Sequence, residues 1–339
     1  MFKWGQDIGI DLGTATVIAY VKGKGIVLRE PSVVAVDNNT GNVLAVGKEA
    51  RRMLGRTPGN IVATRPLREG VISNYTVTEK MLKYFINRVC GKFVFSPRIM
   101  ICIPSQVTEV EKKAVIDAAS QAGARRVYLI EEPMAAAIGA NLDVSEPSGN
   151  IIVDIGGGTT EVAVVSLGGI VISHSLRIAG DELDEDITNY IKREFNLAIG
   201  DTTAEEIKKQ IGCALPLMTE MTMDVTGRDL NTGLPRNIII SSSNVQEAIE
   251  VSINEIVETV KATLEKTPPE LASDIMEKGI VLAGGGALIK NLDKLLSERT
   301  GMPVYVAEDP LDCVVKGTGK TLENIEKLRT VLINARKRV

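Results

Sequence analysis

Histidine is almost absent from this 339-residue chain, in which His174 is the only one. A His-based catalytic triad or a cluster of histidine metal ligands is therefore nearly excluded. Cysteine is also scarce, and no two cysteines form a C-x-x-C pair, which argues against a structural zinc site. Because no signal peptide precedes them, we expect four free thiols in a reducing cytoplasm: Cys90, Cys102, Cys213 and Cys313.

Long apolar runs and strong positive charge are absent too. No run approaches the roughly 20 residues that span a bilayer. The net charge of −4, without a long basic stripe, argues against nucleic-acid binding. The chain is instead 44% hydrophobic and 24% charged, which is typical of a soluble globular protein. At about 100 to 200 residues per domain, its length indicates about two domains.

Two apolar clusters stand out in a chain with only 4% aromatic residues. Phe2 and Trp4 flank a lysine before the first expected strand, and Phe93, Val94 and Phe95 lie in an expected loop. Aromatic side chains beside cations suit the membrane–water interface. Both clusters are thus candidate membrane anchors, and packing of the same side chains into a core is an equally good interpretation.

The order of the expected elements repeats along the chain. Alternating apolar residues predict three strands at the start, with a hairpin turn over residues 39–41. Helix, strand and helix follow, and the same order returns after residue 149. Thr108 with Glu111, and Thr203 with Glu206, predict capping boxes at two helix starts. We therefore predict an α/β protein with two duplicated βββαβα halves.

One short phrase occurs in both halves, first as IGIDLGTATV and later as IIVDIGGGTTEV. Each copy places an aspartate, Asp11 or Asp154, at the end of a buried strand, before a turn rich in glycine and threonine. Such a turn exposes backbone N–H groups with little side-chain bulk, which makes a concave anion site. Two facing turns would grip a polyphosphate from both sides, with the hydroxyls of Thr14, Thr159 and Thr160 as added donors.

Two aspartates beside a polyphosphate would repel it unless a cation lay between them. Mg²⁺ suits this position because it keeps most of its waters and needs few protein ligands. We therefore predict a nucleotide clamp in which Asp11 and Asp154 hold Mg²⁺ through water. Two plain tight turns are the simpler alternative, which the second copy and a third glycine loop disfavour.

The third loop lies in LAGGGALIKNL, where Gly284, Gly285 and Gly286 stand between an expected strand and helix. This geometry lets the backbone approach a flat ligand or a phosphate closely. On the helix AEEIKKQIG, Glu205 and Lys208 lie one turn apart, which indicates a surface ion pair unless that helix lines the cleft. The segment KGTGKT resembles the end of a P-loop but lacks the required earlier glycine, so we reject it.

These motifs resemble those of the actin, Hsp70 and sugar-kinase superfamily, whose fold has two halves around an ATP cleft. DIGIDLGTAT is similar to its first phosphate motif, IVDIGGGTTEV to its second, IVLAGGGALI to its adenosine motif and LIEEPMAAAIG to its first connecting motif. Nearly the whole chain also resembles the bacterial actins of the MreB/Mbl family. Thr16 and Ala283 depart from the family's usual asparagine and threonine, and both keep a small or polar side chain.

The resemblance implies a role for each matching residue. The phosphate loops would hold phosphate and Mg²⁺, Gly180 and Asp181 would lie near the phosphates, and Glu205, Lys208 and the third loop would hold ribose and adenine. The implied nucleotide site is Asp11, Gly13, Thr14, Ala15, Thr16, Asp154, Gly156, Gly157, Gly158, Thr159, Gly180, Asp181, Glu205, Lys208, Gly284, Gly285 and Gly286.

For hydrolysis, the family places an acidic or amide residue just before the proline of the connecting motif, which is Glu132 here. We predict that Glu132 orients the attacking water, assisted by Thr159, and that Glu131 makes a salt bridge. Phosphoryl transfer needs mainly positioning and charge stabilisation, so the scarcity of histidine is no obstacle. The simpler role for Glu132 is that of an acid complementing the dipole at a helix start.

The same resemblance implies an actin-like ATPase fold with four subdomains. Their expected ranges are 1–32, 70–145 and 316–339 for IA, 33–69 for IB, 146–180 and 244–315 for IIA, and 181–243 for IIB. It further implies a slow ATPase with ATP and Mg²⁺ as cofactors, which assembles head to tail into filaments and possible pairs of protofilaments. The filaments would lie in the cytoplasm under the membrane, with membrane proteins of the wall-elongation machinery as partners, and would guide wall synthesis and rod shape.

A non-polymerising ATPase of the same superfamily is the alternative. A chaperone would need a substrate-binding region after the ATPase, whereas this chain ends at Val339 after one expected helix. A kinase would need a general base aimed at a substrate hydroxyl. We find no spare aspartate in a glycine-rich substrate loop, which favours the filament.

Overall fold

The structure is a computed structural model that describes residues 7–90, 96–326, 328 and 331–333. Both candidate membrane anchors, Phe2 with Trp4 and Phe93 with Val94 and Phe95, lie outside the described residues. Within the described ranges, no helix is long and apolar enough to cross a bilayer.

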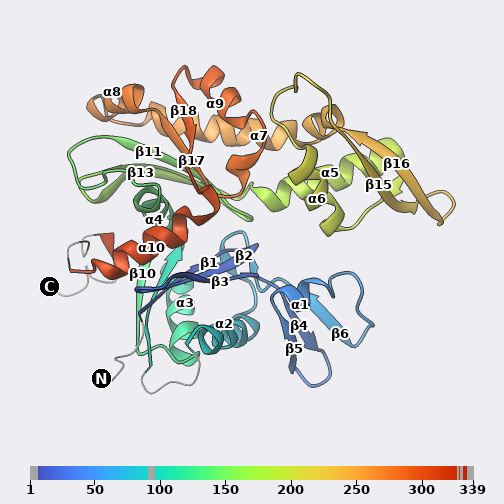
Figure 1. The fold of residues 1–339 in the computed structure, drawn as a ribbon, viewed down its shortest axis with the longest axis horizontal. Helices are drawn as coiled ribbons and strands as arrows, with labels where there is room; N and C mark the ends of the chain where they lie inside the picture. Colours follow the sequence, from blue (N-terminus) through green and yellow to red (C-terminus); the bar gives the residue numbers. More distant parts are fainter. Residues whose placement is uncertain (1–6, 91–95, 327, 329–330, 334–339) are drawn as a thin grey trace.

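Two five-stranded sheets, one from each half of the chain, form the frame of the molecule (Figure 1). Their strand orders are β10-β9-β1-β2-β3 and β13-β12-β11-β17-β18. In each sheet, three consecutive antiparallel strands continue into two parallel ones. The predicted duplication is therefore confirmed.

The bounds of these strands follow the apolar runs of the sequence. The first sheet contains β1 (Asp7–Leu12), β2 (Thr16–Val21), β3 (Gly25–Pro31), β9 (Arg98–Ile103) and β10 (Arg126–Glu131). The second contains β11 (Asn150–Ile155), β12 (Thr160–Ser166), β13 (Gly169–Leu176), β17 (Ile280–Ala283) and β18 (Val304–Val306). Every residue of β11 and β12 is buried, as expected for strands covered on both faces.

Amphipathic helices cover each sheet and complete its core. The first half uses α2 (Tyr75–Cys90) and α3 (Glu109–Gln121), and the second uses α7 (Ser242–Glu265), α8 (Pro269–Lys278) and α9 (Leu292–Thr300). The predicted capping box of Thr108 and Glu111 is confirmed at the start of α3. Ser241 and Asn244 form a second box at the start of α7. Apolar stripes on these helices pack with the strands into two main cores.

Two helices lie between the sheets, α4 (Glu132–Gly139) and α10 (Cys313–Glu323) (Figure 1). They cross with backbone in contact, because a Cβ on Gly139 would lie 1.7 Å from the carbonyl oxygen of Cys313. A Cβ on Gly317 would lie 1.8 Å from the carbonyl oxygen of Ala135. Only glycine permits this approach. The KGTGKT segment lies inside α10 and not in a phosphate loop, which agrees with its rejection.

Each half also carries an outer part on the same side of the frame (Figure 1). The outer part of the first half contains β4 (Val34–Asp37), β5 (Val43–Val46), α1 (Lys48–Arg51) and β6 (Ile61–Thr64), followed by β7 (Leu67–Arg68) and β8 (Val71–Ile72). That of the second half contains α5 (Gly180–Phe195), β14 (Leu197–Ala198), α6 (Asp201–Ile211), β15 (Thr222–Asp229) and β16 (Pro235–Ser241). The predicted hairpin is confirmed by the antiparallel pairing of β4 with β5.

Two local predictions need correction. The capping box of Thr203 and Glu206 is wrong, because α6 begins at Asp201 and its cap, Gly200, makes no side-chain bond. The Gly200 carbonyl already accepts hydrogen bonds from the N–H groups of Thr203 and Ala204, so Thr203 lies inside the first turn.

The third glycine loop does not lead directly into a long helix. A short 3₁₀ turn, η1 (Gly286–Leu288), comes before α9, and a second, η2 (Pro310–Asp312), comes before α10.

Candidate nucleotide-binding site

The two Gly–Thr turns are each held by local hydrogen bonds. In the first, the Ser32 hydroxyl donates to the carbonyl oxygen of Gly13 at 2.6 Å, just before Thr16 starts β2. In the second, the Gly156 N–H donates to the carbonyl oxygen of Thr159 at 2.9 Å. Both turns therefore keep a fixed shape at the end of a buried strand.

The turns face each other at close range between the two sheets. A Cβ on Gly157 would lie 2.7 Å from the Cβ of Ala15, and a Cβ on Gly158 would lie 2.6 Å from Oγ1 of Thr14. A side chain at either glycine would push the two halves apart. The structure thus brings together the two copies of the repeated phrase, which are more than a hundred residues apart in the chain.

Asp11 and Asp154 lie at the base of these turns. Burial is the main cause that raises the pKa of Asp11 to about 6. Burial, with smaller contributions from the charges of Asp11 and Glu161, raises the pKa of Asp154 to about 8. Within the described part of the chain, no lysine or arginine forms an ion pair with either aspartate. The thiol of Cys102 lies 3.4 Å from Oδ1 of Asp11 as a weak donor.

These carboxylates fit a hard cation. Carboxylate oxygens are ligands that Mg²⁺ prefers, and a cation would offset the cost of burying two carboxylates that form no direct ion pair among the described residues. The described residues contain no group of three His, Cys, Asp or Glu side chains placed to ligate a metal directly.

The third glycine loop packs behind the second turn. Gly284 has a φ of 78°, and a Cβ there would lie 2.6 Å from Oδ1 of Asp154. A Cβ on Gly286 would lie 2.2 Å from the side chain of Ile155. Gly285 lies between them and faces Leu311. The third glycine loop and the strand end that leads into the second turn are therefore in direct contact.

Helix α5 starts directly against the second turn. The N–H of Gly180 donates to Gly156 at 3.1 Å, and the N–H of Asp181 donates to Gly157 at 2.7 Å. Lys208 of α6 bonds to the Gly180 carbonyl and pairs with Asp184 at 2.8 Å. Helix α6 therefore lies beside the second of the two Gly–Thr turns, which are the predicted phosphate turns.

Glu205 and Lys208 do not form the simple surface pair that their spacing allows. Glu205 instead pairs with Lys209 and, across the cleft, with Arg51 of α1. Arg51 lies in the first half, so this ion pair joins the halves at the expected ribose side of the site. The sequence gives no signal for Arg51, because 154 residues separate it from its partner.

Glu132 begins α4 immediately after β10. Desolvation raises its pKa well above the ordinary value, and the carboxylates of Glu161, Asp11 and Asp154 raise it further. A carboxylate with a raised pKa accepts a proton from water more readily. Glu132 therefore lies near enough to both aspartates for their charges to act on it.

Sequence reasoning missed Glu161, which is 1% exposed in β12. It lies opposite Asp154 in the antiparallel pairing of β11 with β12. Its carboxylate accepts hydrogen bonds from Ser105 and Ser175. A lone glutamate in an otherwise apolar strand was the available signal, since such residues are rarely buried without a reason.

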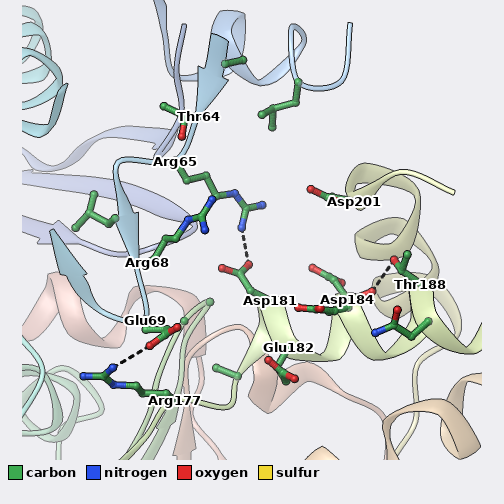
Figure 2. A pocket seen from close by; sticks show the side chains of 18 residues that line it. Thr64, Arg65, Arg68, Glu69, Arg177, Asp181, Glu182, Asp184, Thr188 and Asp201 are labelled. Carbon is green, nitrogen blue, oxygen red and sulfur yellow. Dashed lines mark hydrogen bonds and ion pairs between the residues drawn. The ribbon is translucent and has the colours of Figure 1, made fainter. Parts of the chain in front are cut away.

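A cavity of about 570 Å³ opens over the turns, between the outer parts of the two halves (Figure 2). Gly157 and Gly158 contribute to its lining. Arg177 and Glu69 form an ion pair of 3.0 Å at its edge, and Arg65 pairs with Asp181 at its centre. Cross-cleft ion pairs therefore close the mouth of the site.

Comparison with known proteins agrees with this architecture. Residues 5–330 match the family described as MreB/Mbl protein. The chain is 56% identical over 324 residues to the cell shape-determining protein Mbl of Bacillus subtilis (strain 168), covering 95% of this chain and 97% of that one. It is 54% identical over 327 residues to the cell shape-determining protein MreB of Escherichia coli (strain K12), covering 95% and 94%.

Solved structures give the same picture. The crystal structure of MreB5 of Spiroplasma citri bound to ADP has a TM-score of 0.91 and 42% identity, covering 95% of this chain and 98% of that one. A MamK double helical filament, at 23% identity and a TM-score of 0.81, shares the fold over 94% of this chain and 99% of that one. The match to nearly the whole chain and the identity above one half establish that this chain belongs to the MreB/Mbl family of bacterial actin homologues.

Proposed function

We propose that this protein is an ATP-dependent, filament-forming bacterial actin that lies under the cytoplasmic membrane and organises cell-wall synthesis and rod shape. The observation that carries the proposal is the close approach of the two phosphate turns, with Gly157 against Ala15. Two relatives that are more than half identical are named cell shape-determining proteins. A family structure of the same fold binds ADP and another binds AMPPNP.

In this proposal the nucleotide lies between the halves. The N–H groups of both turns and the hydroxyls of Thr14 and Thr159 bind the phosphates. Glu205, Lys208 and the third glycine loop hold the nucleoside. Asp11 and Asp154 hold Mg²⁺ through water, and the ion supplies charge neutralisation for the phosphates.

Hydrolysis would depend on Glu132. Its raised pKa and its place among the buried carboxylates suit a group that orients water and accepts its proton. Thr159, 7% exposed in the second turn, assists by fixing the geometry. The small outer subdomains, about residues 33–69 and 181–243, supply the head-to-tail surfaces of the filament. Membrane proteins of the wall-elongation machinery are its proposed partners.

Sedimentation with negative-stain microscopy tests this proposal. We would compare the wild type in Mg-ATP, the wild type without nucleotide, and Asp11→Ala in Mg-ATP, each with and without anionic liposomes. Filaments that need Mg-ATP and are lost in Asp11→Ala are the expected result. A monomer that still hydrolyses ATP would instead favour a kinase or a chaperone-type ATPase.

The liposome arm tests the membrane part. The double variant Phe2→Ala with Trp4→Ala should co-sediment less with anionic liposomes while it still polymerises in solution. Unchanged co-sedimentation would contradict the N-terminal anchor and direct attention to residues 93–95.

A further inference from the structure

Glu161 is a buried carboxylate to which the proposed mechanism assigns no contact with the nucleotide or with the attacking water. Its two hydrogen-bond partners come from different halves of the molecule. Ser175 belongs to the neighbouring strand β13, where it lies opposite Glu161 in register. Ser105 belongs to the first half, in the turn between β9 and α3, and donates through both its N–H at 3.2 Å and its hydroxyl at 2.6 Å.

The sheet itself does not require a charge at this position. The two sheets are duplicates, and the strand position opposite each aspartate can be compared. Opposite Asp11 the first half has Ile18, which is 3% exposed, whereas opposite Asp154 the second half has Glu161. Burying a carboxylate is costly unless hydrogen bonds satisfy it. Because the apolar side chain of Ile18 packs well at this position in the first sheet, we take the glutamate in the second sheet to have a role beyond packing.

The contact between Glu161 and Ser105 leads directly to both phosphate turns. Ser105 directly follows Pro104, and Gly70 packs against the side chains of both Pro104 and Thr159. A Cβ added to Gly70 would lie 2.7 Å from Pro104 and 3.0 Å from Thr159. The N–H of Gly70 donates to Oγ1 of Thr14 at 3.1 Å. A shift of Ser105 would therefore be transmitted through Pro104 and Gly70 to a residue of each turn. Close-packed interiors transmit such shifts because they contain few voids.

We propose that Glu161 is a positioning residue, which holds the Ser105 turn of the first half against the second sheet and so fixes the spacing of the two phosphate turns during ATP hydrolysis. This inference rests on the proposed ATPase function. Glu161 acts through Ser105 and contacts no reacting atom in this scheme.

The two serines give a matched pair of variants, because each removes one hydroxyl from the same carboxylate. Ser105→Ala removes the hydroxyl bond between the halves and leaves only the weaker backbone N–H bond, whereas Ser175→Ala removes a hydroxyl bond within the second half. We expect Ser105→Ala to slow single-turnover phosphate release by about tenfold, the range for one hydrogen bond to a charged group. The dissociation constant of a fluorescent ATP analogue should change by less than about threefold, on the same energy scale. Ser105→Thr, which keeps the hydroxyl, should restore the rate.

Ser175→Ala should keep the hydrolysis rate within about twofold of the wild type, since the first half is still held. Equal slowing by both alanine variants would overturn the inference. It would show that hydrolysis depends on Glu161 being hydrogen-bonded in general and not on its contact with the first half. An unchanged rate in Ser105→Ala would overturn it as well.

Hydrogen–deuterium exchange of the nucleotide-free protein tests the contact independently of catalysis. Ser105→Ala should exchange faster than the wild type over both turns, residues 12–15 and 156–159, and Ser175→Ala should not. Unchanged exchange in both turns would overturn the inference. If the wild type does not hydrolyse ATP but Ser105→Ala still exchanges faster than the wild type over both turns, only the proposed function is overturned. The contact between the halves is then still supported.

Discussion

Arg65 reaches across the mouth of the cleft to Asp181, with Nη1 2.5 Å from Oδ1 (Figure 2). Arg65 directly follows β6 in the outer part of the first half, and Asp181 lies in the first turn of α5. The N–H of the same aspartate donates to Gly157 in the second phosphate turn. One ion pair thus connects the outer part of one half to the phosphate turn of the other.

Loss of this ion pair should speed nucleotide release. We expect Arg65→Ala to release a fluorescent ADP analogue about two to five times faster, because a partly exposed ion pair contributes about 0.5–1 kcal/mol. Stopped-flow displacement by excess unlabelled ADP measures the rate. Arg193→Ala, which breaks an exposed pair with Glu194 inside α5, is the control and should release at the wild-type rate. Equal rates in both variants would contradict a closing role for Arg65.

Gly157→Ala should weaken nucleotide binding by about 5- to 150-fold. The added methyl would lie 2.7 Å from the Cβ of Ala15 and must separate the two turns, and overpacking of this kind costs about 1–3 kcal/mol. Isothermal titration with ADP and Mg²⁺ measures the effect. Gly59→Ala, where an added Cβ meets nothing within 4 Å, should bind normally. Normal binding by Gly157→Ala would show that the turns need not approach for the nucleotide to bind.

Glu132→Gln should separate binding from hydrolysis. The amide keeps the shape of the side chain but cannot accept a proton, and general bases of this kind contribute about 10²- to 10⁴-fold. We expect phosphate release to fall by at least about a hundredfold, with ADP affinity unchanged and filaments persisting longer in ATP. Phosphate release in single-turnover conditions measures the first effect and pelleting over time the second. A rate close to that of the wild type would assign water positioning to another residue.

The nucleotide-free protein should lose stability as the pH rises toward 8. Burial raises the pKa of Asp154 from 3.8 to about 8, so the native state binds a proton more tightly than the unfolded state between these values. The resulting stabilisation is fully present below pH 3.8 and is lost as the pH rises through about 8. One such carboxyl changes the free energy of unfolding by at most about 1.4 kcal/mol per pH unit.

Thermal melts at pH 6, 7 and 8 at constant ionic strength test this expectation. The melting temperature of the wild type should fall across the series, and that of Asp154→Asn should fall less. Asp224→Asn removes an exposed carboxylate on β15 and should follow the wild type. Parallel curves for Asp154→Asn and the wild type would show that Asp154 does not cause the decline.

Sequence reasoning performed best where chemistry and spacing are local. The Gly–Thr turns after Asp11 and Asp154 could be predicted because a tight turn at the end of a buried strand needs those residue types. The capping box of Thr108 and Glu111 is equally local. The predicted start of α6 was wrong because backbone hydrogen bonds to the Gly200 carbonyl determine where this helix begins. Such backbone bonds cannot be recognised from the pattern of side chains.

The duplicated α/β architecture and the two turns could be predicted from the amino-acid sequence, since apolar periodicity and glycine-rich turns are properties of neighbouring residues. How the two halves are joined could not be predicted in this way, because it depends on contacts between distant segments. Arg65 with Asp181, Arg51 with Glu205 and Ser105 with Glu161 are separated by 116, 154 and 56 residues. Such pairs meet because the packing of the two halves brings distant segments together, so no spacing in the chain predicts them.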